Sequence, residues 1–481
     1  MNFRPAIEQL SRRLPAPGEF QLTEALFLRL LALIYAVSFA SFWPQIVGLV
    51  GSRGIAPAYQ LLNAIHQQSG SRIYFEMPTL FWLGISDAAL VAFCAIGCLA
   101  GLVMATGFFT RSSATICWIL YLSIAAVGQP FSNFQWDALL LESGLLALFA
   151  GAPLLVWAYR FLLFRLMLES GLVKLISHDP NWHNLHALRF HFLTQPLPNP
   201  IAWYAFYLPG WILDSMTAAT LAIELIAPFL LFAPKRLRYI GLAFLALLQA
   251  AILLTGNYAF FNFLTLALCL WGLNDQALAP VARCFRRGPK TLQNRILRAL
   301  STAALLALMG LGAVTLINIP LPGFDRPVSK ILAITGPIEI VNTYGLFAVM
   351  TTTRPEIIME GSNDQLHWTE YAFRYKPGNL HRRLPWVAPY QPRLDWQMWF
   401  AALGSYQENT WVGGLIYRLL TGEPSVANLM EPSPFPKPPR FIRAMLYDYQ
   451  FTTQQERSRT GNIWRRTLQG VWFGPVALKN P

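Results

Sequence analysis

Long runs of apolar residues, separated by short polar turns, dominate the first two thirds of the chain. A helix crosses the ~30 Å hydrocarbon core of a bilayer in about 20 residues, and each run can do so, although the fourth, fifth and eighth are short or interrupted. The pattern predicts a bundle of about nine transmembrane helices within residues 24–320, after a cytoplasmic segment at 1–23. The runs are 24–49, 79–108, 113–130, 138–157, a fifth that ends near Ile176, 210–233, 239–256, 259–274 and 299–320.

The pattern changes after the last of these runs, because no later apolar stretch is long enough to span a bilayer. Residues 355–375 surround the turn signal at 361–364 and predict a β-hairpin. Residues 394–406 predict an amphipathic helix, and the alternation at 440–452 predicts another strand. We therefore expect residues 321–481 to form a small β-rich domain outside the cytoplasm, packed on the membrane surface.

Composition and charge support a membrane protein. Apolar residues make up 54% of the chain and charged residues 13%, about half the share found in soluble domains. The formal net charge of +13 does not indicate nucleic acid as a partner, because the basic residues flank apolar runs instead of forming one recognition element. With the N-terminus in the cytoplasm, most of the membrane domain's basic loops fall on the cytoplasmic side. They lie at 12–13, 111, 160, 235–238 and 283–298.

Cysteines and histidines indicate no metal site. None of the five cysteines lies after Cys284, so the exported domain needs no disulfide. The polar loop at 177–207 contains four histidines, but their spacing does not match a zinc site. These are His178, His183, His186 and His191.

Ionisable and amide side chains inside the apolar runs are candidates for function, because they are costly within a bilayer. The candidate catalytic residues are Lys174, Glu142 and Asp137. A polar intramembrane cluster is expected from Arg165, Glu169, Glu224, Asn257 and Asn262. Several of these positions lie toward the non-cytoplasmic ends of their runs, which predicts one outward-facing pocket under the loop at 177–207.

Two interpretations of these polar residues remain open. If Lys174 were desolvated it could act as a base, although a nearby carboxylate would oppose that role. The alternative, to which we give more weight, is a set of ion pairs and hydrogen bonds that hold the helices together.

Three groups of motifs carry a resemblance to a known family. The first is WDALLLESG at 136–144. The second includes LMLESGLVKL at 166–175 and a loop motif with Trp182, His191, Gln195 and Asn199. The third comprises VNTYGLF at 341–347, RPE at 354–356 and LDWQMWFAAL at 394–403. Together they resemble the lipase maturation factor family, from the first helix to about residue 470.

The resemblance implies a multispan membrane protein that assists the folding or maturation of exported client proteins, which in animals are secreted lipases. Its partners would be the bilayer and an exported client such as a lipase. No retention signal stands at 479–481, and the exported domain has no cysteine. Both features favour a bacterial inner membrane with the domain in the periplasm; in a eukaryote the resemblance implies the endoplasmic reticulum membrane.

A second, shorter resemblance leads to a different hypothesis. The segment GLVKL at 171–175, with Asp179 and Trp182, resembles the region of the catalytic lysine in vitamin K-dependent γ-carboxylases. It implies a membrane enzyme in which Lys174 is the base for a lipophilic quinol-like substrate, with a lipophilic quinone as the cofactor. Whether the chain is an enzyme is left open by the sequence.

Overall fold

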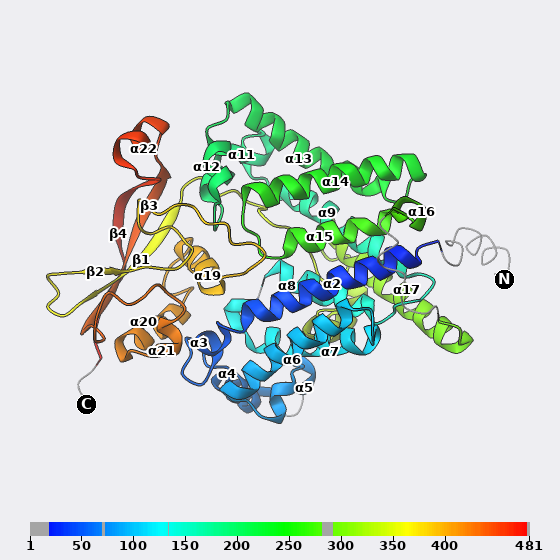
Figure 1. The fold of residues 1–481 in the computed structure, drawn as a ribbon, viewed down its shortest axis with the longest axis horizontal. Helices are drawn as coiled ribbons and strands as arrows, with labels where there is room; N and C mark the ends of the chain where they lie inside the picture. Colours follow the sequence, from blue (N-terminus) through cyan, green and yellow to red (C-terminus); the bar gives the residue numbers. More distant parts are fainter. Residues whose placement is uncertain (1–18, 70–72, 133, 281–291, 479–481) are drawn as a thin grey trace.

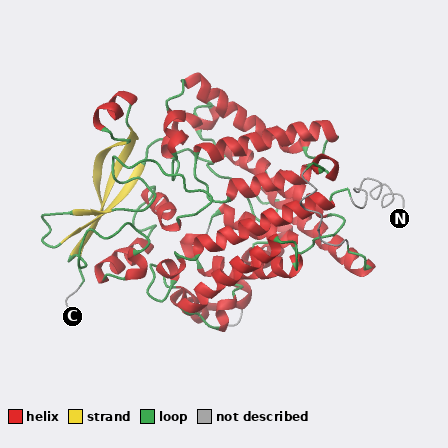
Figure 2. Cartoon of the chain, in the orientation of Figure 1, coloured by secondary structure: helices red, strands yellow, loops and turns green. Residues whose placement is uncertain are grey.

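The computed structural model describes residues 19–69, 73–132, 134–280 and 292–478. The helices form a bundle, and an antiparallel sheet lies at one end of it (Figure 1). Helix α2 (Gln21–Phe42) begins at the end far from the sheet and runs toward it. The molecule is thus elongated, with helices along most of its length and strands confined to one end (Figure 2).

Six helices in the described part of the chain are long and apolar enough to cross a membrane. Their exposed faces carry large apolar side chains, such as Phe229 and Leu247, which suit contact with lipid. These helices are α2, α6 (Asp87–Ala105), α7 (Thr110–Val127), α13 (Gly210–Leu230), α14 (Lys235–Thr255) and α17 (Arg295–Asn318).

The predicted count of about nine spans is not confirmed. The other three predicted runs also contain helices, which are α8 (Gln135–Ala147), α9 (Leu155–Ile176) and α15 (Phe261–Cys269). Helices α8 and α15 have only 13 and 9 residues. Helix α9 has 22 residues but contains four charged ones, and most of its side chains are buried inside the bundle.

Short helices interrupt or connect the long ones. The run predicted at 24–49 is broken, because α2 ends at Phe42, two residues before Pro44, whose missing N–H and fixed φ terminate helices. The loop predicted at 177–207 contains three helices on the sheet side: α10 (Pro180–His183), α11 (Ala187–Thr194) and α12 (Pro200–Phe206). The remaining short helices before the sheet are α3 (Ile46–Val50), α4 (Ala58–Ser69), α5 (Ile73–Glu76), η2 (Leu80–Leu83), η3 (Gln129–Ser132), η4 (Leu270–Gly272), α16 (Asp275–Leu278), η6 (Arg326–Val328), α18 (Ser329–Thr335) and η7 (Gly336–Ile338).

The sheet has four antiparallel strands in the order β2-β1-β3-β4. The predicted hairpin is confirmed as β1 (Pro355–Ser362) and β2 (Thr369–Tyr371), and the predicted strand is confirmed as β3 (Phe441–Phe451). Strand β4 (Trp464–Val476) was not predicted. Its side chains are mostly exposed or half-buried and do not alternate regularly between buried and exposed positions. It pairs with β3 and leaves its other edge unpaired among the described strands.

Four helices accompany the sheet and connect it to the bundle. The predicted amphipathic helix is confirmed as α19 (Arg393–Ala402), and it lies between the sheet and the bundle (Figure 1). The others are α20 (Trp411–Thr421), α21 (Pro424–Ala427) and α22 (Gln454–Thr460). One hydrophobic core continues from α2 and α9 into α19 and β1, so the two parts of the chain share apolar packing.

Candidate functional site

The junction between the bundle and the sheet region contains a buried ion pair between distant parts of the chain. Both terminal nitrogens of Arg393 donate to the carboxylate of Asp137, at 2.9 Å and 2.8 Å. Neither side chain is more than 3% exposed. Arg393 also stacks over the ring of Phe42, with the guanidinium carbon 3.5 Å from its centroid. Because both charges are removed from water, either one would be costly without the other.

A second network joins α8 and α9 to the chain after α17. Arg165 donates to Glu142 at 2.7 Å and to Glu169 at 3.1 Å. The other oxygen of Glu142 accepts from the Tyr344 hydroxyl at 2.7 Å, and the other oxygen of Glu169 accepts from the Tyr344 N–H at 2.7 Å. Arg165 also donates to the carbonyl of Asn342. Every carboxylate oxygen in this network has a donor, so the group is complete without a ligand.

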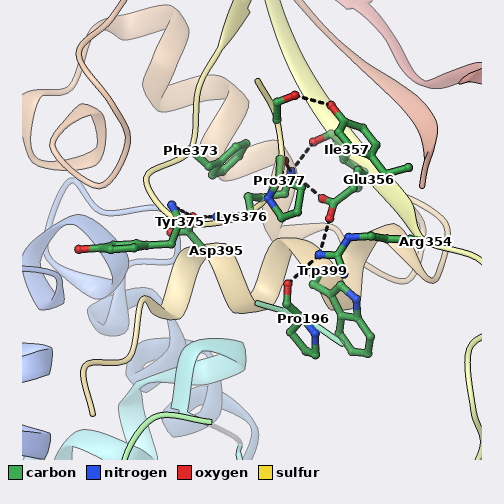
Figure 3. Close-up of polar contacts among 12 residues, drawn as sticks. Pro196, Arg354, Glu356, Ile357, Phe373, Tyr375, Lys376, Pro377, Asp395 and Trp399 are labelled. Atoms are coloured by element: carbon green, nitrogen blue, oxygen red, sulfur yellow. Dashed lines mark hydrogen bonds and ion pairs between the residues drawn. The ribbon is translucent and has the colours of Figure 1, made fainter. Parts of the chain in front are cut away.

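A third network lies at the base of the sheet, where Arg354 reaches toward the loop before α12 (Figure 3). Its guanidinium donates to the carbonyls of Leu193, Gln195 and Pro196, at 2.5–2.8 Å. Glu356 lies between two cations, with Arg354 and Lys376 each 2.8 Å away. Burial lowers the pKa of Arg354, while the neighbouring carboxylate opposes that shift.

Asp395 lies on α19 beside this network (Figure 3). It accepts the N–H groups of Tyr375 and Lys376, each at 2.8 Å. Burial raises the pKa of Asp395 to about 6, and the two N–H donors oppose that rise. We call the three networks, together with Asp395, the joint. The first network is Asp137 with Arg393, and the second is Arg165 with Glu142, Glu169 and Tyr344. The third is Arg354 with Glu356 and Lys376, which Asp395 adjoins.

The predicted loop motif also connects segments at the joint. The indole N–H of Trp182 donates to the carbonyl of Phe347 at 2.9 Å. Gln195 donates to the carbonyl of Thr255 at 2.8 Å. Asn199 caps α12 by accepting two N–H groups and donates to Leu254. Asn257 donates to the carbonyls of Leu197 and Pro385, and its side-chain oxygen accepts the N–H of Val387.

Lys174 lies apart from the joint, beside a cavity between α9, α13, α14 and α15. Its ammonium donates to both oxygens of Glu224, at 2.9 Å and 2.8 Å, and to the carbonyl of Ser170 at 3.0 Å. Its three N–H groups are therefore matched by three acceptors. Loss of a proton from Lys174 would leave the buried carboxylate of Glu224 without a counter-charge, which opposes the role of a base.

The wall of the cavity carries further polar groups. The Tyr258 hydroxyl lies 3.1 Å from Nε2 of His191 and 3.0 Å from Gln195. Burial, and then the positive charge of Lys174, lowers the pKa of His191 to about 4, so the ring is neutral near pH 7. Asn262 donates to Gln249 at 2.8 Å. We call this space the α13–α14 cavity.

The predicted site residues therefore separate instead of forming one pocket. The structure brings Lys174, Glu224, Asn262 and His191 to the α13–α14 cavity, whereas Asp137 and Glu142 lie in the joint. The prediction of a single outward-facing pocket is wrong because these carboxylates are paired by residues after 340. The catalytic roles of Lys174, Glu142 and Asp137 stay predictions.

Sequence reasoning missed the cation that neutralises Asp137. Arg393 was not singled out, although it is buried and bonded to that predicted residue. The sequence does contain a signal for Arg393. This residue directly precedes the amphipathic helix predicted at 394–406, and a cation that such a helix buries needs a partner. In the described part of the chain, no three His, Cys, Asp or Glu side chains are grouped to hold a metal ion.

Comparison with known proteins settles the family. A model of the lipase maturation factor transmembrane domain matches residues 22–280, and a model of the lipase maturation factor C-terminal domain matches residues 340–474. The chain belongs to the lipase maturation factor family. The stretches at 136–144, 166–175, 341–347 and 354–356, on which the resemblance rests, supply several residues of the joint. They include Glu142, Glu169, Tyr344 and Glu356.

Individual relatives of the chain come from vertebrates. Lipase maturation factor 2 of Mus musculus is 34% identical over 592 aligned positions, which cover 95% of this chain and 83% of the relative. The protein of the same name from Homo sapiens is 34% identical, with 96% and 83% covered. Lipase maturation factor 1 of Bos taurus is 32% identical, with 96% and 90% covered. No solved structure matches the chain.

These comparisons confirm a membrane protein of this family and give no support to two other predictions. One is the γ-carboxylase-like enzyme with a quinone cofactor. The other is a bacterial inner membrane with a periplasmic domain, since the relatives named above are animal proteins.

Proposed function

We propose that this protein is a membrane-anchored maturation factor that assists the folding of exported clients of the lipase class. The names of its relatives support the client class, and their similarity extends over 95–96% of the chain. In this proposal residues 24–320 form the membrane domain, and residues 321–481 act on the exported side. The bilayer and the client are the partners.

The positions of basic residues support that orientation. Arg160, Lys235 and Arg295 lie at the starts of α9, α14 and α17, at the end of the bundle far from the sheet. Basic residues are enriched on the cytoplasmic side of membrane proteins. The sheet then lies on the opposite side, where exported clients fold.

Strand β4 is the surface that carries the proposal. It has 13 residues, pairs only with β3 among the described strands, and exposes Leu468 and Val471 by 53% and 61%. An edge strand with an unpaired side is a template for an additional strand from another chain. An incompletely folded client offers such extended segments, so β4 is suited to hold one by main-chain hydrogen bonds and apolar contacts.

The proposal is tested by placing a charge on this edge. Lysine on an edge strand opposes pairing with a further strand. We expect Leu468→Lys with Val471→Lys to lower the yield of active secreted lipase in a co-expression assay by about tenfold, which corresponds to ~1.4 kcal/mol of client binding.

The matched control is Leu366→Lys. The Leu366 side chain is 80% exposed and lies in the turn between β1 and β2, away from β4. It should leave lipase yield within about twofold, since isolated surface changes have little effect on stability. Normal lipase yield with the β4 double variant would contradict the role of this edge. Normal yield after removal of residues 340–474 would contradict the proposed function itself.

A further inference from the structure

The α13–α14 cavity has the size of a small organic molecule. Its volume is about 130 Å³. An engineered apolar cavity of ~150 Å³ is known to hold benzene, so this space admits one ring or one short length of a single alkyl chain. Most of its lining is apolar, including Met167, Phe192 and Ile252.

The cavity lies between two helices that face lipid. At Gly241 the helices are in close contact, because an added Cβ would lie 2.6 Å from the Cβ of Leu230. Toward the sheet end α13 and α14 diverge (Figure 1). The lining there includes Ala251, which is exposed, and Thr220, which is half-buried. In a bilayer this gap opens to acyl chains, and a ligand can enter sideways.

The polar wall carries no uncompensated charge. Lys174 and Glu224 neutralise each other at 2.8 Å, and His191 is neutral near pH 7. An anionic head group would find no free cation among the described lining residues, and a cationic one no free carboxylate. The wall therefore favours a head group that is uncharged and forms hydrogen bonds.

A buried amide beside the cavity has an unpaired atom. Asn262 is 1% exposed and lines the cavity, yet its Oδ1 has no hydrogen-bond partner. Its Nδ2 donates to Gln249, whose own Nε2 reaches only the sulfur of Met167 at 3.6 Å. Reversing both amides would pair Oδ1 and leave Nδ2 unpaired instead. In either orientation one amide group at the cavity lacks a partner, which costs about 1–3 kcal/mol unless a ligand supplies one.

We propose that the α13–α14 cavity binds a neutral, single-chain lipid with a hydroxyl-bearing head group, of the monoacylglycerol class, which enters from the bilayer between α13 and α14. In this proposal the Asn262 side chain turns toward the cavity, and its unpaired amide group bonds the head group. The first methylenes fill the apolar space, and the rest of the chain continues between the helices into the bilayer. This site rests only on the cavity and is independent of the client and of strand β4.

The test uses the full-length protein in lipid nanodiscs with a photoreactive monoacylglycerol that carries a diazirine in its acyl chain. We expect saturable labelling of peptides from α13 and α14, read by mass spectrometry. Unlabelled monoacylglycerol should compete, whereas a fatty-acid anion and phosphatidylglycerol should compete at least about tenfold less well, because each brings an unpaired charge to the wall.

Two variants at exposed alanines of the same helix provide the control. Ala251→Phe places a ring at the opening and should lower labelling by about tenfold, whereas Ala243→Phe should leave it within about twofold. Ala243 is exposed on α14 but does not line the cavity. Both variants should elute as folded protein in gel filtration. Equal labelling of the two variants would overturn the site.

The head-group assignment is tested by Asn262→Leu, which removes the unpaired amide. We expect monoacylglycerol to compete about fivefold less well in this variant, the effect of one hydrogen bond. A long-chain alkane without a head group should compete as well as it does in the wild type. If monoacylglycerol competes equally in both proteins, or if the fatty-acid anion competes as strongly as monoacylglycerol, the assignment of a neutral head group is wrong.

Discussion

The joint and the α13–α14 cavity use the same kinds of side chains for different ends. In the joint, Glu142, Arg165 and Glu169 are bonded to each other and to Tyr344, so the network is complete within the protein. At the cavity the Lys174–Glu224 pair is complete, but the adjacent Gln249–Asn262 pair is not. The difference teaches that a charged residue inside the membrane does not by itself mark a ligand site.

The largest effect is expected from breaking the joint at Arg393. Arg393→Ala leaves the carboxylate of Asp137 buried without its cation, which typically costs about 3–5 kcal/mol. We expect a strongly lowered thermal unfolding midpoint in detergent and a low yield of folded protein. The control is Arg443→Ala, because the pair of Arg443 with Glu360 is partly exposed and is worth about 1 kcal/mol or less. Equal losses in the two variants would show that the joint does not hold the structure together.

A smaller effect is expected at the base of the sheet. Arg354→Met removes the donor to three carbonyls of the loop at 193–196, while Glu356 keeps Lys376 as a partner. We expect a loss of about 2–3 kcal/mol. Hydrogen exchange should rise in residues 193–196 and in β1, and stay unchanged in α2. Unchanged exchange at 193–196 would mean that this clamp is unimportant.

The pair at the cavity distinguishes a structural role from a chemical one. Lys174→Met alone leaves Glu224 unpaired and should destabilise the protein by about 3 kcal/mol. Adding Glu224→Leu removes both charges and should restore the stability to within about 1 kcal/mol of the wild type. If the pair is structural, the double variant also recovers lipase maturation. Recovery of stability without recovery of maturation would instead favour a chemical role for Lys174.

A graded effect is a pH dependence of stability from His191. Its folded pKa of about 4 lies below the ordinary value of about 6.5, so the unfolded chain binds a proton more readily between these values. Stability from this group is present above pH 6.5 and is lost as pH falls toward 4, at up to ~1.4 kcal/mol per pH unit. His191→Phe should remove this slope, and subtracting its unfolding curve from that of the wild type cancels the titration of Asp395. Parallel curves for the two proteins would contradict the assignment.

Local pattern predicted local structure well, and long-range pairing poorly. The turn signal at 361–364 and the alternation at 440–452 identified β1, β2 and β3, because the required contacts lie near in sequence. Strand β4 escaped because its side chains are exposed on both faces and its place depends on β3. Asp137 and Glu142 were recognised as unusual, but Arg393 lies 256 residues from Asp137 and Tyr344 lies 202 residues from Glu142. Nothing in a local pattern says whether such a charge meets a partner or a ligand.

The distance between Asp137 and Arg393 has a consequence for synthesis of the chain. Polypeptides grow at about 5–20 residues per second, so 256 residues take on the order of 10–50 s. During that interval Asp137 has already left the ribosome, while the cation that will neutralise it does not yet exist. Helix α8 therefore has an unneutralised carboxylate near its start until translation is almost finished. A chain that stops before Arg393 never acquires the cation that pairs with Asp137, so the free energy of that buried charge stays uncompensated.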